Sequence, residues 1–368
     1  MGGHDFVYLL ILITFVIIWE NSKIPIPSSV FAVCLGMVVS YIWKEIPFHF
    51  TPEFFMYMLL PPILLHSSFK FDLNSLRRTW LSSLMFAVPG TLLSVLMIAG
   101  GIYVWTDEVD IVNILIFGAI LAPTDTVATM SLRSRIQDDG VVLDVLENES
   151  VMNDAISVAL VHILSKMSGQ PGLLVSTEAV LFSLLMLVVS GCLGIGASYV
   201  MNKVMSTDIS LHYLSSLLVY GLCETVGISG IVCLFVYGST VVAPVELKKT
   251  VSALASMMES YVYLMLGLAL PSYEFSWMSL AILVACIVSR IVVVFFVGCL
   301  LQLCGQRHWT MPKLLFFSLC GVRGAISYAL CLEVGTTFQK STTFVVVMCT
   351  VICMSSLQRC MHRFLLTI

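Results

Sequence analysis

An acidic and amide-rich stretch opens a long apolar segment near the middle of the chain. Residues 146–155 read LENESVMNDA and lead into the apolar run 158–164. A charged side chain at the centre of a bilayer costs about 2.5–3.5 kcal/mol on insertion scales, so carboxylates there usually face a cavity and serve a function. We therefore predict functional roles for Glu149 and Asp154. The alternative, a solvated first turn of a helix, applies best to Glu147.

Glu149 and Asp154 are expected to point in different directions. Five residues correspond to about 140° around a helix, so the two carboxylates need not share one partner. Ser150 and Asn153 add hydroxyl and amide groups beside them. Hard cations prefer oxygen ligands, and a carboxylate must be deprotonated to bind a cation. A buried carboxylate at Asp154 would therefore bind a proton or a cation, but not both.

Other ionisable residues interrupt apolar sequence further along the chain. Arg290 lies within the apolar run 285–296 and needs an anionic partner. Glu149 is the candidate for that partner in a structural ion pair, which would leave Asp154 free to change its protonation state. Glu259 interrupts another apolar segment; it is either a second cavity group or a polar contact in helix packing.

Two apolar segments contain residues that break helices. The first is GAILAPTDT at 118–126, which includes Asp125, and the second is CGVRGAIS at 320–327, which includes Arg323. Proline and glycine disrupt or loosen the helical hydrogen-bond ladder. Where two broken helices cross, Asp125 would neutralise the facing positive helix ends and Arg323 the negative ends. The alternative is a simple proline kink with an arginine that reaches the interface.

The composition indicates a membrane protein. The 368 residues are 59% hydrophobic and only 11% charged, with a mean hydropathy of +1.00, whereas soluble domains average about 25% charged residues. The net charge of −4 gives no support for nucleic-acid binding. The twelve cysteines include no CxxC pair, so we expect neither a zinc site nor a disulfide framework. The first apolar segment lacks the features of a signal peptide and is treated as a retained span.

Apolar runs separated by charged or Pro/Gly breaks predict thirteen membrane helices. Their expected limits are 5–20, 27–43, 52–69, 79–104, 110–131, 144–166, 177–202, 209–225, 228–243, 250–270, 275–303, 311–332 and 341–362.

The basic residues favour one orientation of these spans. With the N-terminus outside or in the lumen, three lysines fall outside, namely Lys44, Lys166 and Lys340. Thirteen basic residues then fall on the cytoplasmic side: Lys23, Lys70, Arg77, Arg78, Arg133, Arg135, Lys203, Lys248, Lys249, Arg307, Lys313, Arg359 and Arg363. The excess of cytoplasmic Lys and Arg follows the positive-inside rule. It places the C-terminus in the cytoplasm.

The positions of the broken spans indicate an internal repeat. Residues 1–166 and 209–368 each contain six predicted spans, joined by a linker helix within 167–208. The broken spans, numbers 5 and 12, are each the fifth in their half, a pattern typical of transporters built from inverted repeats. The predicted fold is therefore an all-α polytopic membrane protein: one transmembrane transport domain of two inverted six-helix repeats with crossed broken helices.

The ordered motifs resemble those of sodium/proton exchangers of the monovalent cation/proton antiporter superfamily, in the electroneutral eukaryotic-type branch. Residues 149–154 are similar to the family's GES-x-x-ND signature, residues 118–126 to its G-A-I-x-x-x-T-D-P segment, and residues 321–326 to its G-L-R-G-A-I segment. Residues 59–63 are similar to its LLPPI helix. Arg290 falls where the family has its membrane arginine. The resemblance extends over nearly the whole chain.

The resemblance implies a mobile core domain beside a dimerisation domain in a homodimer. It implies that Asp154 alternates between Na⁺ and H⁺, that Thr124, Asp125 and Ser150 line the ion site, and that Asn153 shapes it. Glu149 and Arg290 would form the core ion pair. The sequence departs from the family at Thr126, where proline is usual, and at Asn148, where glycine is usual.

We expect a secondary antiporter that exchanges Na⁺, or alternatively K⁺ or Li⁺, for H⁺ in the plasma membrane or an endosomal membrane, and so contributes to pH regulation. It would need no cofactor, and no P-loop motif indicates ATP use. No G-x-S-x-G or HExxH motif indicates an enzyme. The alternatives are a cation channel and a non-transporting sensor or scaffold. Lipids are expected partners, and no cytoplasmic regulatory domain is expected within residues 1–368, so regulatory partners would bind a C-terminal tail beyond them.

Overall fold

The structure is a computed structural model that describes residues 3–20, 27–42, 52–71, 73–105, 110–125, 140–167, 177–204, 208–270, 276–306, 308–335 and 339–364. All regular secondary structure in these ranges is helical. The α-helices are α1 Gly3–Glu20, α2 Ser28–Ile42, α3 Pro52–Phe54, α4 Leu60–Lys70, α5 Leu73–Met85, α6 Thr91–Tyr103, α7 Ile111–Leu121, α9 Val141–Met167, α10 Thr177–Val204, α11 Ile209–Val226, α12 Gly230–Thr240, α13 Val245–Ala269, α14 Trp277–Leu303, α15 Met311–Leu319, α16 Ala325–Val334 and α17 Gln339–Phe364; the π-helical segments are η1 Phe55–Leu59 and η2 Phe86–Gly90.

The helices match the predicted membrane segments well. A helix lies in each of the thirteen predicted ranges, and within the described residues five helices are long and apolar enough to cross a bilayer. These are Asn74–Tyr103, Leu185–Lys203, Ile209–Val226, Val245–Ala269 and Trp277–Leu303. The total number of crossings stays a prediction. The second half of the fifth predicted span, with Thr126, lies outside the described residues.

Local sequence explains where several helices begin and where they bend. Asp208 and Ser276 cap the N-termini of α11 and α14, because their side chains accept hydrogen bonds from first-turn N–H groups. Two short π-helical segments continue α3 into α4 and α5 into α6. One precedes Pro61 and Pro62 and the other contains Pro89, and such a local change of pitch absorbs the hydrogen bonds that proline cannot make.

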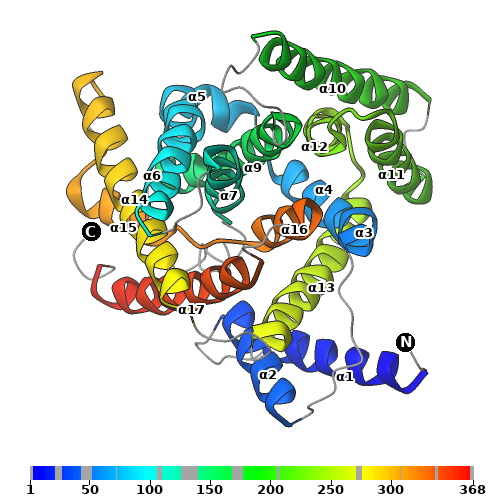
Figure 1. The fold of residues 1–368 in the computed structure, drawn as a ribbon. Helices are drawn as coiled ribbons and strands as arrows, with labels where there is room; N and C mark the ends of the chain where they lie inside the picture. Colours follow the sequence, from blue (N-terminus) through cyan, green and yellow to red (C-terminus); the bar gives the residue numbers. More distant parts are fainter. Residues whose placement is uncertain are drawn as a thin grey trace.

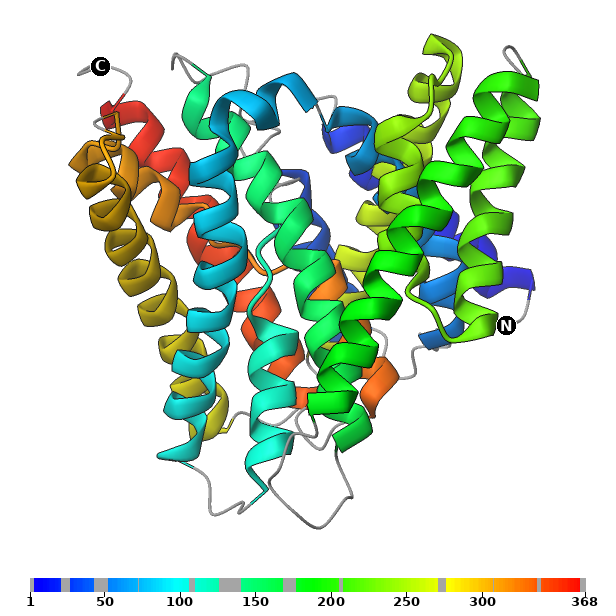
Figure 2. The same cartoon turned by 90° about the horizontal axis from the view of Figure 1, so that it is seen from above.

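The helices form two groups that lie on opposite sides of the molecule (Figures 1 and 2). The crossing group consists of α5, α6, α7, α9, α14, α15 and α17, and the flanking group consists of α1, α2, α4, α10, α11, α12 and α13. Helix α16 contacts members of both. Each group takes helices from both the N-terminal and the C-terminal parts of the chain, so the spatial division does not follow the division of the sequence into halves.

Within the flanking group, α2 and α13 approach each other closely. A Cβ on Gly36 would lie 2.8 Å from the Leu268 nitrogen, and one on Gly267 would lie 2.9 Å from the Val33 carbonyl carbon. Only residues without a side chain allow backbones to pack this tightly, as is common between membrane helices. This contact makes α13 part of a firmly packed unit.

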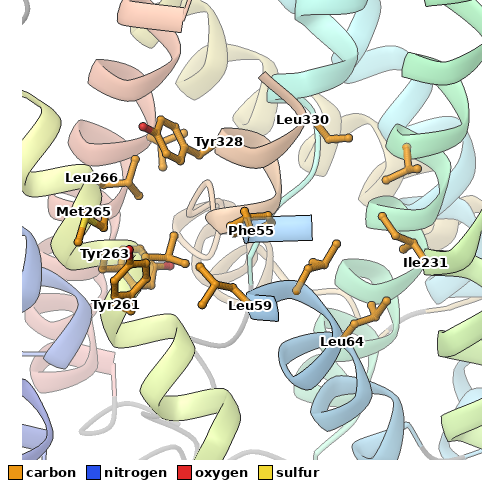
Figure 3. Close-up of a cluster of buried hydrophobic side chains, with 14 of the residues drawn as sticks. Phe55, Leu59, Leu64, Ile231, Tyr261, Tyr263, Met265, Leu266, Tyr328 and Leu330 are labelled. Atoms are coloured by element: carbon orange, nitrogen blue, oxygen red, sulfur yellow. The ribbon is translucent and has the colours of Figure 1, made fainter. Parts of the chain in front are cut away.

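A buried apolar cluster joins the flanking group to α16 (Figure 3). Phe55 and Leu59 of η1 belong to the same cluster as Tyr263 of α13 and Tyr328 of α16 and lie beside them. All four side chains are nearly or fully buried. The Tyr263 hydroxyl lies at the edge of this cluster and reaches a group of buried polar residues where α7 and α15 end.

Candidate functional site

The site is built around two helices that stop in the middle of the crossing group. Helix α7 ends at Leu121 and α15 at Leu319, and the chain continues without regular secondary structure through 122–125 and 321–324. The two non-helical segments touch where the Asp125 N–H donates a 2.8 Å hydrogen bond to the Val322 carbonyl. The structure therefore brings the two broken segments together, as their residues predict.

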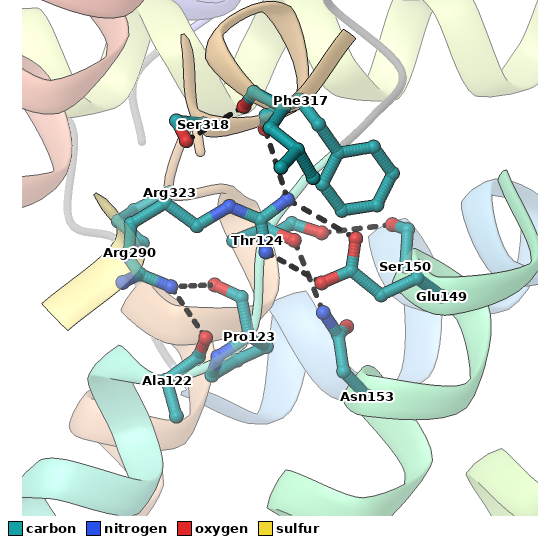
Figure 4. A network of polar contacts seen from close by, with 11 residues as sticks. Ala122, Pro123, Thr124, Glu149, Ser150, Asn153, Arg290, Phe317, Ser318 and Arg323 are labelled. Carbon is teal, nitrogen blue, oxygen red and sulfur yellow. Dashed lines mark hydrogen bonds and ion pairs between the residues drawn. The ribbon is translucent and has the colours of Figure 1, made fainter. Parts of the chain in front are cut away.

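Arg323 lies at the C-terminal end of α7. Its Nη1 donates to the Ala122 carbonyl and, at 3.1 Å, to the Pro123 carbonyl (Figure 4). The side chain is only 1% exposed. The carbonyl end of a helix carries a partial negative charge, which the guanidinium offsets. Arg323 thus stabilises backbone groups that the break would otherwise leave without partners.

Asp125 lies at the start of α16, the opposite kind of helix end. A Cβ on Gly324 would approach to 2.7 Å from the Asp125 carboxyl carbon, so the carboxylate lies directly against the N-terminus of this helix. That end carries partial positive charge, which a carboxylate offsets. Arg323 and Asp125 thus each lie at one helix end of the sign that the crossed-helix prediction gives them, Arg323 at the C-terminus of α7 and Asp125 at the N-terminus of α16.

Glu149 and Arg290 form a buried ion pair between α9 and α14. Arg290 Nη1 and Nη2 donate to the two Glu149 carboxylate oxygens at 2.5 and 3.1 Å, and Nη2 also donates to the Phe317 carbonyl at 3.3 Å (Figure 4). Two parallel hydrogen bonds fix both side chains. Both charges are thereby committed to each other, and neither side chain lines the cavity described next.

Ser150 and Asn153 form hydrogen bonds to the non-helical segment that follows α7. The Ser150 hydroxyl donates to the Thr124 carbonyl at 2.8 Å, and the Asn153 amide donates to the Thr124 hydroxyl at 3.0 Å. All three residues are buried. Asn153 Oδ1 has no hydrogen-bond partner among the described residues. Thr124 therefore presents its oxygens from a fixed position one residue before Asp125.

Asp154 and Asp125 line a common cavity of about 50 Å³, which has room for a few water molecules or a partly dehydrated cation. Ser150 lines the same cavity. Within the described part of the chain, Asp154 makes no hydrogen bond or ion pair. An ionised carboxylate in this position calls for a cation or a proton. The structure thus brings together Asp154, Asp125 and Ser150, with Thr124 and Asn153 beside them.

Three more charged residues line the cavity, of which the sequence gives only Glu259 a possible cavity position. Lys70, Glu147 and Glu259 line it, so of the two alternatives for Glu259 the cavity position is the one observed. Tyr263, one turn after Glu259 on α13, donates a 2.8 Å hydrogen bond to Asp125 Oδ2. The sequence signal for Tyr263 is its spacing of four residues from a membrane carboxylate, which places both on one helix face.

The departure at position 148 has a structural explanation. Asn148 Nδ2 lies 3.2 Å from the Thr79 hydroxyl and 3.4 Å from the Ser83 hydroxyl, both on α5. The amide therefore contributes to the packing of α9 against α5, and its position does not change the lining of the cavity. Thr126, the other departure, lies outside the described residues.

Comparison with known proteins gives a consistent family assignment. The sequence model described as "Sodium/hydrogen exchanger, transmembrane" matches residues 10–367. Sodium/hydrogen exchanger 8 of Mus musculus is 27% identical over 378 residues, which cover 89% of this chain and 65% of the relative. The endosomal/prevacuolar sodium/hydrogen exchanger of Saccharomyces cerevisiae is 30% identical over 185 residues, which cover 45% of this chain and 29% of the relative. The chain spans slightly less than two thirds of the length of the mouse protein.

Solved structures show the same fold. The sodium proton antiporter MjNhaP1 from Methanocaldococcus jannaschii, at pH 8, matches with a TM-score of 0.77 at 18% identity, covering 98% of this chain and 100% of the other. A second structure of the same antiporter gives a TM-score of 0.78 at 17% identity, with 99% and 97% covered.

Proposed function

Because the chain belongs to the sodium/hydrogen exchanger family, we propose that it exchanges Na⁺ for H⁺ across a membrane, with both ions competing for Asp154. The observation that carries this proposal is the position of Asp154, in a cavity that it shares with Asp125 and Ser150 and without a partner among the described residues. A carboxylate paired with an arginine would not be free to change its state, and the pairing of Arg290 with Glu149 leaves Asp154 available.

The proposed ion site is a set of oxygen ligands around the cavity. Asp154, Asp125, Thr124 and Ser150 offer carboxylate, hydroxyl and carbonyl oxygens, the ligands that hard cations prefer. Asn153 positions Thr124 through its hydroxyl. Protonation of Asp154 removes the charge that binds Na⁺, so the two ions exclude each other. The amide at position 153, where a second carboxylate would add charge, supports electroneutral exchange. K⁺ and Li⁺ are the alternative cations, because the same oxygen ligands bind them.

The two groups of helices provide the proposed moving parts. We assign the crossing group as the core domain that carries the ion and the flanking group, with its close α2–α13 contact, as the dimerisation domain of a homodimer. Rocking of one against the other would expose the cavity to each side in turn. In the sequence, the core domain is formed by the later helices of each proposed inverted repeat, 1–166 and 209–368. Residues 167–208 form the linker between the two repeats.

The name of the Saccharomyces cerevisiae relative, an endosomal/prevacuolar exchanger, supports a location in an endosomal membrane, and the plasma membrane is the alternative. We propose an N-terminus outside or in the lumen and a cytoplasmic C-terminus, on the distribution of Lys and Arg. Partners that regulate a longer exchanger would act through a cytoplasmic tail that follows the membrane helices.

Exchange in proteoliposomes tests the proposal. An inward Na⁺ gradient should raise lumenal pH with the voltage clamped, and Asp154→Asn should abolish the signal. Asp208→Asn is the matched control: it replaces an acid outside the cavity with another good helix cap, so exchange should persist. Conductance without coupled proton movement would instead indicate a channel, and exchange that persists in Asp154→Asn would contradict the proposed site.

A further inference from the structure

Ser327 lies in the wall of the cavity, one turn into α16. It lines the same space as Asp125, Asp154 and Ser150. It follows Gly324 by three residues, so both lie on the same face of the chain, and Gly324 is the residue that the Asp125 carboxylate approaches. Ser327 is therefore placed beside the carboxylates of the proposed ion site, on the opposite broken segment from Thr124.

The Ser327 hydroxyl has no partner among the described residues although it is buried. The residue is 1% exposed, and its Oγ makes no hydrogen bond to any of them. Ser190 and Ser318 satisfy their hydroxyls within their own helices, by donating to the Met186 carbonyl at 2.7 Å and to the Leu314 carbonyl at 2.8 Å. Ser29 and Ser157 also lack a partner among the described residues, but neither lines the cavity. A buried polar atom left without a partner costs about 1–3 kcal/mol. The Ser327 hydroxyl thus calls for something that enters the cavity.

The charges around the cavity indicate what that occupant is. Its lining contains four carboxylates, those of Asp125, Asp154, Glu147 and Glu259, and, among the described residues, a single amine, that of Lys70. This excess of negative charge favours a cation over an anion. A hydroxyl oxygen is a neutral, hard ligand of the kind that alkali cations accept.

We propose that Ser327 Oγ is a further ligand of the transported cation, adding a neutral oxygen from α16 to those supplied by α9 and the segment after α7. This rests on the proposed function, because it places the ligand in the same ion site. Ser327 would thereby give the second broken segment a role in cation affinity. Its other charged residue, Arg323, binds the carbonyl groups at the end of α7 instead. Water alone in the cavity is the competing occupant, and binding data distinguish the two.

The experiment measures cation binding directly on the purified full chain. Na⁺ that binds the folded state stabilises it by RT ln(1 + [Na⁺]/Kd), so a fit of melting temperature against Na⁺ concentration gives Kd, the midpoint concentration of binding; choline chloride at equal ionic strength is the blank. Ser327→Ala should raise the Na⁺ midpoint about three- to ten-fold, since one neutral contact is lost. Ser327→Cys keeps the volume and removes the oxygen, so it should shift the midpoint similarly. Ser190→Ala, a buried serine outside the cavity, should leave it unchanged.

The outcomes separate this inference from the proposed function. If the Na⁺ midpoint of Ser327→Ala equals that of the wild type, only water contacts the hydroxyl and the inference is overturned. The proposed function is unaffected by this result as long as exchange is observed in liposomes. A wild type that Na⁺ does not stabilise more than choline also overturns it. Exchange that survives Asp154→Asn contradicts the proposed function, whatever the Ser327 variants show.

Discussion

Tyr263 of α13 donates a hydrogen bond of 2.8 Å to Asp125, at the point where the two broken segments cross. Tyr263 belongs to the flanking group and Asp125 to the crossing group. The bond therefore joins the two groups through a residue of the proposed ion site. If one group rocks against the other, this hydrogen bond must either break or move with Asp125. The bond also helps to hold the Asp125 carboxylate in place.

Removal of this hydroxyl should weaken cation binding. In Tyr263→Phe, Asp125 loses its donor, so we expect the apparent Na⁺ KM to rise several-fold and stability to fall by about 1 kcal/mol. Tyr237→Phe is the control, because it loses a comparable 2.8 Å contact with Ser215 away from the cavity. Exchange rates and melting curves of both variants check this. Equal Na⁺ KM values in Tyr263→Phe and wild type would show that Asp125 does not need the tyrosine.

The pair Glu149–Arg290 should behave as a structural unit. Glu149→Gln leaves the Arg290 charge buried at 6% exposure, which should cost about 3–5 kcal/mol of stability. Glu149→Gln combined with Arg290→Met should be less destabilising than Glu149→Gln alone, since no unpaired charge remains. Melting temperatures of the single and double variants in detergent measure this coupling. A single variant as stable as the wild type would argue against a structural ion pair.

Gly324 should tolerate no side chain. Its φ of −111° suits any residue, but a Cβ there would overlap the Asp125 carboxylate. We expect Gly324→Ala to lower exchange at least about ten-fold, since a displacement of even about 1 Å at a preorganised site has effects of this size. Gly196→Ala in α10, where a Cβ meets no atom within 4 Å, is the control. Normal exchange in Gly324→Ala would mean that Asp125 can move without loss of function.

Competition at Asp154 predicts the direction of the pH effect. A lower pH protonates more of the Asp154 carboxylate, and only its charged form binds Na⁺, so the apparent Na⁺ KM should rise as pH falls. Where Asp154 is mostly protonated, one pH unit should change KM by up to about ten-fold. Initial rates of Na⁺ uptake over a range of Na⁺ concentrations at several pH values measure this. A KM that stays constant with pH would place the proton and the cation on different groups.

The sequence predicts the charged residues of the site, because a charged side chain inside a bilayer has a high free-energy cost and therefore needs a function or a partner. Asp154, Asp125, Glu149, Arg290 and Arg323 stand out because each interrupts apolar sequence, and Pro and Gly mark the breaks that bring two of them together. The partnership of Arg290 with Glu149 is predictable because a buried arginine needs an anion.

The remaining groups could not be identified from the sequence. Ser327 is an ordinary residue of a membrane helix, and the only sequence signal for Tyr263 is its spacing of four residues from Glu259; the packing of α13 and α16 around the crossing is what gives both a role. Lys70 is placed at the cytoplasmic interface by its position near a helix end, yet it lines the cavity. The division of the helices into two spatial groups also cannot be derived from the order of the residues, because each group combines helices that are far apart in the chain.

Proton release on Na⁺ binding tests the competition at Asp154 most directly. Na⁺ is added to purified protein in a weakly buffered detergent solution near the pH where exchange is half-maximal, and the pH change is followed with an indicator dye. We predict that Na⁺ displaces protons from the wild type, up to one per chain, that choline displaces none, and that Asp154→Asn releases none while Asp208→Asn behaves as wild type. Binding of Na⁺ without proton release in the wild type, or undiminished release in Asp154→Asn, would contradict competition at this carboxylate.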